Sequence, residues 1–278
     1  MNPILFAFAI FPVAPPEAGI GLDVITAAKR VVITGSSTSR DVLVRALDGA
    51  AAPSRTVNEG RVVIRDADES ARIVNGTYRI IVPLNTQLRV RIRCEIVENQ
   101  PCPNSTVSIE NVGVVKFESV DGKAEISRIN GDVHAATLHG SLTISAVKGS
   151  VVAASQTNAI NVNDVTGNLV TRSITGMTSI SSALGGAKAT NTTGEIKLAG
   201  RVSKSSQYSL TTDIGHIRLG LADGSDATIE ANAPPERITI HGPGARRTHV
   251  NGRRSIIIVG SGGARITAET LNGGIEIR

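Results

Sequence analysis

The chain has 278 residues and a formal net charge of +5, with 28 glycines, no tryptophan and only 2% aromatic residues. This composition is typical of a narrow core filled by aliphatic side chains, and it excludes a broad core packed with aromatic rings. The positive charge is modest and dispersed. A nucleic-acid surface needs clustered Lys and Arg with stacking aromatics, so we predict no nucleic-acid partner.

The N-terminal segment Ile4–Ala14 is apolar but too short to span a bilayer as a helix. It resembles the core of a secretory signal, with small residues near Ala18 as a cleavage point. We therefore expect residues 1–18 to be a signal peptide or apolar leader, and the protein to be periplasmic, in the cell envelope or secreted, with no transmembrane span. Because no Lys or Arg precedes the run and prolines interrupt it, an apolar strand or tail in a cytoplasmic protein is the alternative.

Residues 19–111 alternate β-branched runs with turns and predict an N-terminal β layer. A short helical turn at Asp23–Lys29 is an alternative within it. The layer is expected to cap the first coil of the repeat region beyond it, because an uncovered sheet end exposes unpaired backbone. The expected strands are Arg30–Thr34, Val42–Ala46, Arg61–Arg65, Tyr78–Val82 and Leu88–Ile92.

The two cysteines, Cys94 and Cys102, bracket a turn-like Asn-Gln-Pro segment. In an exported protein they could close a hairpin disulfide, which loop entropy values at about 2.5 kcal/mol. The alternative is a pair of free thiols in a reducing compartment. A metal site is less favoured, because no His or second Cys pair lies nearby.

Residues 112–201 divide into ten consecutive units of nine residues. The fourth and sixth positions of each unit are mostly apolar and face one side of a strand, while the third, fifth and seventh face the other. An often apolar ninth position is expected to tuck in at the corner. The second position is glycine in nine units and Asn in one. Because Asn tolerates a left-handed backbone best among non-glycine residues, this position predicts a turn in every unit. That position reads Gly113, Gly122, Gly131, Gly140, Gly149, Asn158, Gly167, Gly176, Gly185 and Gly194.

The sixth position alternates in size after Phe117. The small members are Ala135, Ala153, Thr171 and Ala189, and the large members are Ile126, Ile144, Val162, Ile180 and Leu198. The true period is therefore eighteen residues, with small side chains of one sheet facing large ones of the other. The predicted fold is all-β: a two-sided parallel β-solenoid of about 18 residues per coil, with β caps at both ends.

Residues 202–278 lose the nine-residue period but keep strand-like runs, so they are expected to continue and cap the solenoid. The Asn272-Gly273 pair could also form a two-residue hairpin. The cluster Arg246, Arg247, Arg253 and Arg254 flanks a turn and is interpreted as a solvated edge. The expected strands are Tyr208–Thr211, His216–Leu219, Ala227–Glu230, Arg237–Ile240, Ser255–Val259, Ala264–Ala268 and Gly274–Arg278.

Several segments together resemble the bacterial putative-adhesin family of β-strand-repeat domains of unknown function. They are TYRIIVPLNTQLRVRI, NGDVHAATL, HGSLTISAV, YSLTTDIGHIRLGLA and ARITAETLNGGIEIR, and the resemblance covers roughly residues 30–278. It implies a β-solenoid and attachment to a bacterial surface or envelope. The family supplies no catalytic residues, and this chain departs from it at Cys94–Cys102, which stands where a glycine turn is expected.

Searches for catalytic and metal chemistry find nothing at usable spacing. The five histidines (His134, His139, His216, His241 and His249) form no metal-spaced pair. The third position of the repeat lacks the recurring Asp of a calcium-binding solenoid. Asp121, Asp132 and Asp164 are scattered over separate coils, unlike a paired-carboxylate site. We predict no enzyme activity, no metal and no cofactor.

One outward face is uncharged over the fourth, sixth and eighth units of the repeat, whose strands are expected to be neighbours in one sheet. Lys123 and Glu125 flank it at one end, and Glu195 and Lys197 at the other. As a candidate interaction face it could contact a glycan, a cell-wall polymer or another copy of the chain; the alternative is a merely solvated ladder. Its members are Ser141, Thr143, Ser145, Asn161, Asn163, Ser179 and Ser181, with Ala159 and Met177 beside them.

These patterns favour a non-catalytic, adhesin-like scaffold of the envelope or secreted space. A self-assembling, filament-forming β-helix and a carbohydrate-active enzyme are the alternatives.

Overall fold

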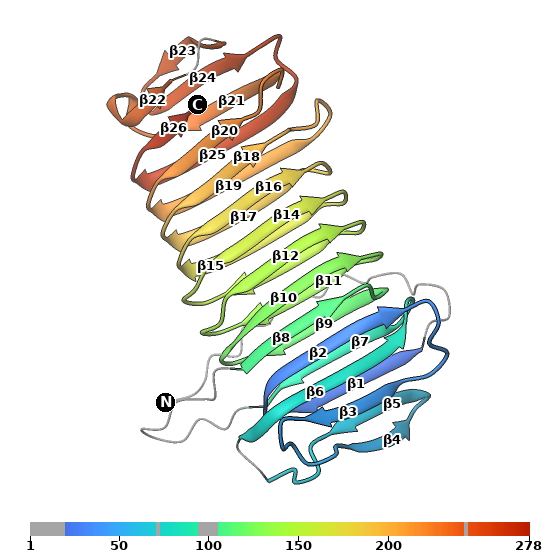
Figure 1. Ribbon diagram of the computed structural model, residues 1–278. Coiled ribbons are helices and arrows are strands. Elements are labelled where there is room, and N and C mark those ends of the chain that lie inside the picture. Colours follow the sequence, from blue (N-terminus) through green and yellow to red (C-terminus); the bar gives the residue numbers. More distant parts are fainter. Residues whose placement is uncertain (1–19, 71–72, 94–104, 242–243) are drawn as a thin grey trace.

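The computed structural model describes residues 20–70, 73–93, 105–241 and 244–278. The predicted leader and the Cys94–Cys102 pair lie outside these residues. The chain forms a column of two long, mostly parallel β-sheets that face each other (Figure 1). The all-β, two-sided solenoid predicted from the repeat is confirmed.

The first sheet, called sheet A, has 14 strands among the described residues. In spatial order they are β23 (Ala245–Asn251), β24 (Arg254–Val259), β21 (Ala227–Asn232), β25 (Ala264–Asn272), β19 (Gln207–Ile214), β17 (Ala187–Thr193), β15 (Leu169–Thr175), β13 (Val151–Ser155), β11 (Val133–Thr137), β9 (Val114–Ser119), β7 (Gln87–Ile92), β1 (Gly21–Thr26), β5 (Arg61–Arg65) and β4 (Ser54–Asn58).

The second sheet, sheet B, has 12 strands in the described part of the chain. They are β22 (Ile238–Ile240), β26 (Ile275–Ile277), β20 (Ile217–Leu221), β18 (Ile196–Gly200), β16 (Thr178–Ala183), β14 (Ile160–Val165), β12 (Leu142–Val147), β10 (Gly122–Ile129), β8 (Ser105–Glu110), β2 (Ala28–Ser36), β6 (Val74–Pro83) and β3 (Leu43–Leu47). A single 3₁₀ turn, η1 (Pro235–Arg237), precedes β22.

Each nine-residue unit carries one strand, and alternate units enter alternate sheets. Val133 of sheet A pairs with Val115 and Val151, which lie eighteen residues before and after it. Leu142 of sheet B pairs with Ala124 and Ile160 in the same way. The coil therefore contains two strands and eighteen residues.

The interior meshes small residues against large ones. Ala135 of sheet A and Ile126 of sheet B are only 3% and 1% exposed, and both lie in one continuous hydrophobic core. Of the residues that alternate in size at the sixth position of the repeat, the small ones fall in sheet A and the large ones in sheet B. Close packing of complementary sizes keeps the column narrow without leaving voids.

The glycines are needed for a different reason from the one inferred from the sequence. Left-handed backbone occurs at Gly122, Gly176 and Gly194 but not at Asn158 or the six other glycines. Each glycine instead stacks on the corresponding residue of the preceding coil. A Cβ on Gly167 would lie 2.6 Å from the carbonyl oxygen of Gly149, so only hydrogen fits there. Asn158 is the exception, and its Nδ2 donates a hydrogen bond to the His139 carbonyl at 2.5 Å.

The two corners of each coil are built differently. Where sheet B returns to sheet A, the eighth residue of the unit is left-handed, and this turns the apolar ninth residue inward. The left-handed residues are Arg128, Ala146, Asp164 and Ser182, with φ of 53°, 52°, 61° and 57°. The buried ninth residues are Ile129, Val147, Val165 and Ala183.

Where sheet A passes to sheet B, a polar eighth residue points inward instead, so the ninth residue is half-buried or exposed there. The oxygen Oγ1 of Thr137 accepts a hydrogen bond from the Gly140 amide at 2.9 Å, and Ser155 donates to the Gly140 carbonyl at 3.2 Å. Asn191 donates to the carbonyls of Gly176 and Glu195. Thr137, Ser155 and Asn191 of this buried polar row thus pair with backbone groups at the bend.

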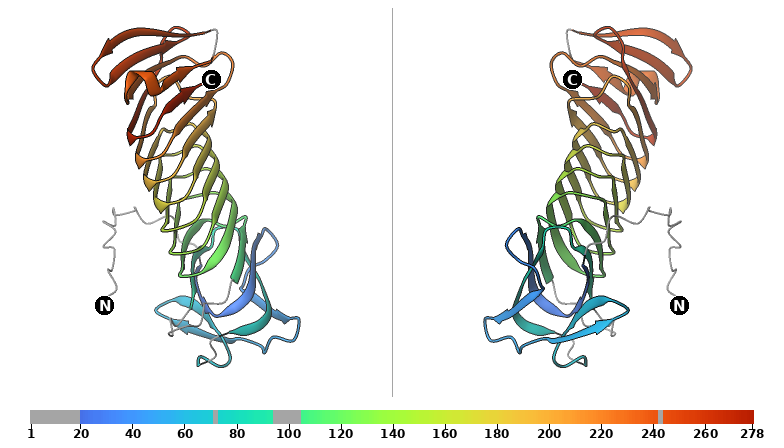
Figure 2. Two further views of the ribbon diagram at one scale, coloured as in Figure 1. Left: turned by 90° about the vertical axis from the view of Figure 1, so that its left-hand side faces the viewer. Right: turned by 90° about the vertical axis from the view of Figure 1, so that its right-hand side faces the viewer.

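Both ends of the column are closed by chain that folds back over them (Figure 2). At one end β5 and β6 cover the first coil, while β7 and β8 return between that coil and the repeats. At the other end β25 and β26 stack on β19 and β20, and the intervening chain adds β21 to β24 beyond them. The outermost strands β3, β4, β23 and β24 pair antiparallel.

Two local expectations are wrong. Asp23–Lys29 forms no helical turn, because Val24 and Ala28 are core residues of the strands β1 and β2. Asn272-Gly273 does not close a hairpin, because it joins β25 of sheet A to β26 of sheet B. Residues 112 and 201 mark the limits of the repeat, and both sheets continue through these positions.

Asp66, which follows β5, links the first coil (β1 and β2) to the strands that pack on either side of it. Its carboxylate accepts hydrogen bonds from Thr26 Oγ1 at 2.5 Å and from the Ala27 amide at 2.8 Å, and it pairs with Arg93 at 2.6 Å. The side chain is fully buried. Burial, together with the charge of Asp66, raises the pKa of Tyr78 to about 12, so this phenol stays neutral.

Replacing Gly167 by Ala is expected to destabilise the column by about 1–3 kcal/mol or more, because the added methyl group meets backbone rather than a movable side chain. The control is Gly220→Ala, where the nearest atom to a new Cβ lies 3.9 Å away and the loss should be small. Thermal and urea unfolding of both variants measure the difference. Equal losses would contradict the stacking role of the glycines.

Replacing Asp66 by Asn should cost about 3–5 kcal/mol, because it leaves Arg93 without its buried partner. The exposed pair Lys123–Glu125 provides the control, and Glu125→Gln should cost at most about 1 kcal/mol. Urea unfolding at pH 7 compares the two. If Asp66→Asn lowers the free energy of unfolding no more than Glu125→Gln does, the Asp66 carboxylate does not stabilise the packing of β5 on the first coil.

Candidate ligand-binding faces

The uncharged residues predicted as an interaction face lie together on the outside of sheet B. Two rows run across β12, β14 and β16 in register, at one residue per strand. The first row is Thr143, Asn161 and Ser179, and the second is Ser145, Asn163 and Ser181. Ser141 precedes β12 at the same face. These seven residues are called the neutral face.

The neutral face is bounded by charge on both sides. Lys123 pairs with Glu125 at 2.6 Å before it, and Glu195 pairs with Arg218 at 3.0 Å beyond it. Within the described residues, none of its seven side chains forms a hydrogen bond to another protein group. Their hydroxyl and amide groups are therefore free to bind an external ligand or water.

A groove of about 1220 Å³ lies on the opposite side of the molecule, on the outside of sheet A. Its floor is one register row that crosses β15, β17, β19, β25, β21 and β24. The row reads Val170, Lys188, Ser209, Thr267, Glu230 and Ile256. At the usual separation of neighbouring strands, it spans roughly 24 Å.

One wall of the groove arises from an insertion. Ala187 pairs with Tyr208, twenty-one residues later, so this coil is three residues longer than the eighteen-residue coils of the repeat. The extra chain loops out, and Ser205 and Ser206 line the groove. The buried Tyr208 hydroxyl anchors the loop, because it accepts from the Ser203 amide at 3.1 Å and donates to the Ala183 carbonyl at 2.8 Å.

Asp226 fastens this loop to the neighbouring one. Its carboxylate pairs with Lys204 at 2.6 Å and accepts a hydrogen bond from the Ser261 amide at 2.7 Å. The hydrogen bonds from Lys204 and Ser261 lower the pKa of Asp226 to about 2, so the carboxylate is charged at neutral pH. Contacts within the protein therefore hold this wall of the groove in place without a ligand.

The groove carries an excess of positive charge. Glu230 and Arg254 form a two-point pair, with contacts of 2.7 and 2.9 Å. Lys188 and Arg265 also line the groove, and neither has a carboxylate partner among the described residues. Three cations against one carboxylate leave two positive charges.

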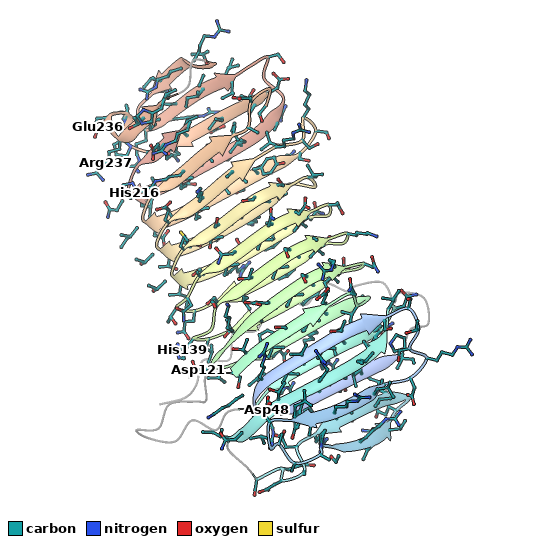
Figure 3. All side chains as sticks on the ribbon, in the orientation of Figure 1. Asp48, Asp121, His139, His216, Glu236 and Arg237 are labelled. Carbon is teal, nitrogen blue, oxygen red and sulfur yellow. The ribbon has the colours of Figure 1, made fainter. Side chains whose placement is uncertain are left out.

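Other chemistry-bearing residues stay dispersed. Figure 3 places His139 near Asp121 at one edge of the column and His216 near Glu236 and Arg237 towards its C-terminal end. Nδ1 of His139 lies 3.1 Å from the Thr157 hydroxyl. In the part of the chain that the structure describes, no three His, Cys, Asp or Glu side chains gather as metal ligands. Asp121, Asp132 and Asp164 lie on three successive coils.

The C-terminal arginines lie at a sheet edge and serve structural contacts. Arg247 donates to the Ile238 carbonyl at 2.8 Å, and Arg253 donates to the Thr270 carbonyl at 2.8 Å. Arg254 is held by Glu230. Three of the four guanidinium groups are thus engaged within the cap.

The comparisons with known proteins give no family assignment. No family model and no curated protein matches the chain, so the family resemblance stays a prediction. One solved structure, of a "putative cell adhesion protein" from Clostridium sporogenes, is 11% identical over 93% of this chain and 92% of that chain, with a TM-score of 0.22. A TM-score this low supports no inference about this chain.

Among the described residues, no helix has the length and apolar character needed to cross a bilayer.

Proposed function

We propose that this protein is a non-catalytic binding scaffold of the cell envelope or secreted space, with the neutral face as its contact surface for a glycan or cell-wall polymer. The observation that carries the proposal is the pair of register rows on sheet B. They present uncharged hydroxyl and amide groups, which have no hydrogen-bond partner among the described residues, on strands paired in register. Such groups suit ligands rich in hydroxyls and amides.

A non-catalytic role is supported by the placement of the acidic residues. Hydrolysis of a glycosidic bond needs two carboxylates that face one bond, about 5 to 9.5 Å apart. The groove is lined by one carboxylate, Glu230, and Arg254 holds it in an ion pair. The envelope or secreted location is part of the same proposal, and it rests on the leader predicted at residues 1–18.

End-to-end self-assembly is the second candidate. Leu43 and Leu47 on the outermost strand β3 are 53% and 40% exposed, and exposed apolar edges favour association. Against it, β3 carries Arg45, and β23 at the opposite end carries Arg246. Because charged side chains on an edge strand oppose pairing with another chain, we favour a single-chain scaffold. A monomer in light scattering supports this choice, and concentration-dependent growth contradicts it.

The double substitution Thr143→Lys with Ser179→Lys should abolish binding to the neutral face, because it places two charges within the rows that contact the ligand. The probes are insoluble peptidoglycan and a panel of neutral polysaccharides, in pull-down and titration assays with the full chain. The wild-type chain should bind at least one probe.

The matched control is Ala136→Lys with Thr190→Lys, which adds the same charge to the outside of sheet A. It should bind as the wild type does. Unchanged binding by the sheet B variant removes the neutral face as the contact surface, and binding to none of the probes refutes the proposed ligand class.

A further inference from the structure

We propose that the groove on sheet A is a second binding site, which takes a linear acidic polysaccharide: a hydroxyl-rich chain that carries carboxylates. Lys188 and Arg265 are the residues that pair with those carboxylates. The groove lies on the sheet opposite the neutral face, so this site does not depend on the function proposed above.

The shape of the groove fits an extended chain rather than a compact ligand. Its floor crosses six strands in register, from Val170 to Ile256, over roughly 24 Å. The loop with Ser205 and Ser206 and the turn at Gly263 line one side. A polymer can therefore lie along the register row, across the strands.

The charges of the groove are free and separated. Lys188 and Arg265 lie two strands apart and are offset by two residues along the chain, which puts their Cα atoms roughly 12 Å apart. Both side chains are exposed and lack carboxylate partners among the described residues. Two separated cations suit carboxylates carried at intervals on one chain, and Arg can bind a carboxylate through two parallel hydrogen bonds.

Neutral polar groups fill the space around the two cations. Ser209 and Thr267 lie in the floor row, and Gln207 and Thr228 lie in the next row along the same face. None of these four side chains is hydrogen-bonded to another described residue. Hydroxyl and amide groups both donate and accept, as recognition of sugar hydroxyls requires.

Two other polyanions fit the groove less well. Single-stranded nucleic acid binds through aromatic rings that stack on bases, but the one aromatic residue of the lining, Tyr208, is 2% exposed and lies under the floor. An acidic peptide that binds as an added strand needs a free sheet edge. The floor strand β19 is paired on both sides, with β17 and β25.

The test is titration of the full chain with polygalacturonate and alginate oligosaccharides at low salt. The wild type should bind at least one of them, and affinity should fall as NaCl is added. Lys188→Glu with Arg265→Glu should weaken binding by roughly tenfold or more, because it reverses both cations in the groove. Circular dichroism and the thermal midpoint confirm that the variant is folded.

The matched control is Arg89→Glu with Lys197→Glu, which makes the same charge change on exposed residues outside the groove. It should retain binding within about twofold of wild type, since its altered residues do not line the site. Thr143→Lys with Ser179→Lys should also bind acidic oligosaccharides normally, which separates the groove from the neutral face.

Four outcomes would overturn the proposal. They are no binding to either acidic polysaccharide, an equal loss in the matched control, equally tight binding of poly-glutamate, and equally tight binding of oligo-dT. The second would show attraction to overall charge alone, and the last two would show that sugar hydroxyls are not recognised.

Discussion

The close approach of backbone at the glycine corners is the constraint on which the rest of the structure depends. Parallel strands stack at one fixed spacing, and the corner segments must stack at that spacing too. At Gly167 and most of its counterparts, a Cβ would lie too close to the backbone of the coil before, and Asn158 is the one exception in the repeat. Once the corners stack, the coils between residues 112 and 201 are fixed at eighteen residues, and this fixes the register of both sheets there. The size alternation inside the column can then persist over many coils.

The sequence was sufficient to predict the strands, the two-sided coil and the burial of Ala135 and Ile126, because these depend on a simple repeated pattern. It was insufficient for the corners. Left-handed residues such as Arg128 and Ala146 have no composition that marks them. The buried polar row had a signal, since Ser or Thr recurs at Thr137, Ser155 and its counterparts every eighteen residues. Polar side chains are ordinarily expected outside, so only the structure shows this row facing inward.

The candidate binding surfaces differ in how far they could be predicted. The neutral face could be predicted from the repeat, because register alone places its residues side by side. The groove could not be predicted this way, because one of its walls depends on three extra residues before Tyr208. Its floor also combines strands that are distant in the sequence, such as β17 with Lys188 and β25 with Arg265. An interruption of a regular repeat is therefore where a distinct site arises. The regular repeat determines the fold, but it contains few residues that distinguish one position as a functional site.

Removing whole or half coils tests the two-strand coil most directly. Deletion of residues 148–165 removes one complete coil, so every later strand keeps its sheet, its register and its size partner. Deletion of residues 157–165 removes one unit and moves small residues such as Thr171 into positions that sheet B fills with large ones. The first protein should show β-sheet circular dichroism and cooperative thermal unfolding, and the second should not fold. Equal stability of the two deletions would contradict the eighteen-residue coil.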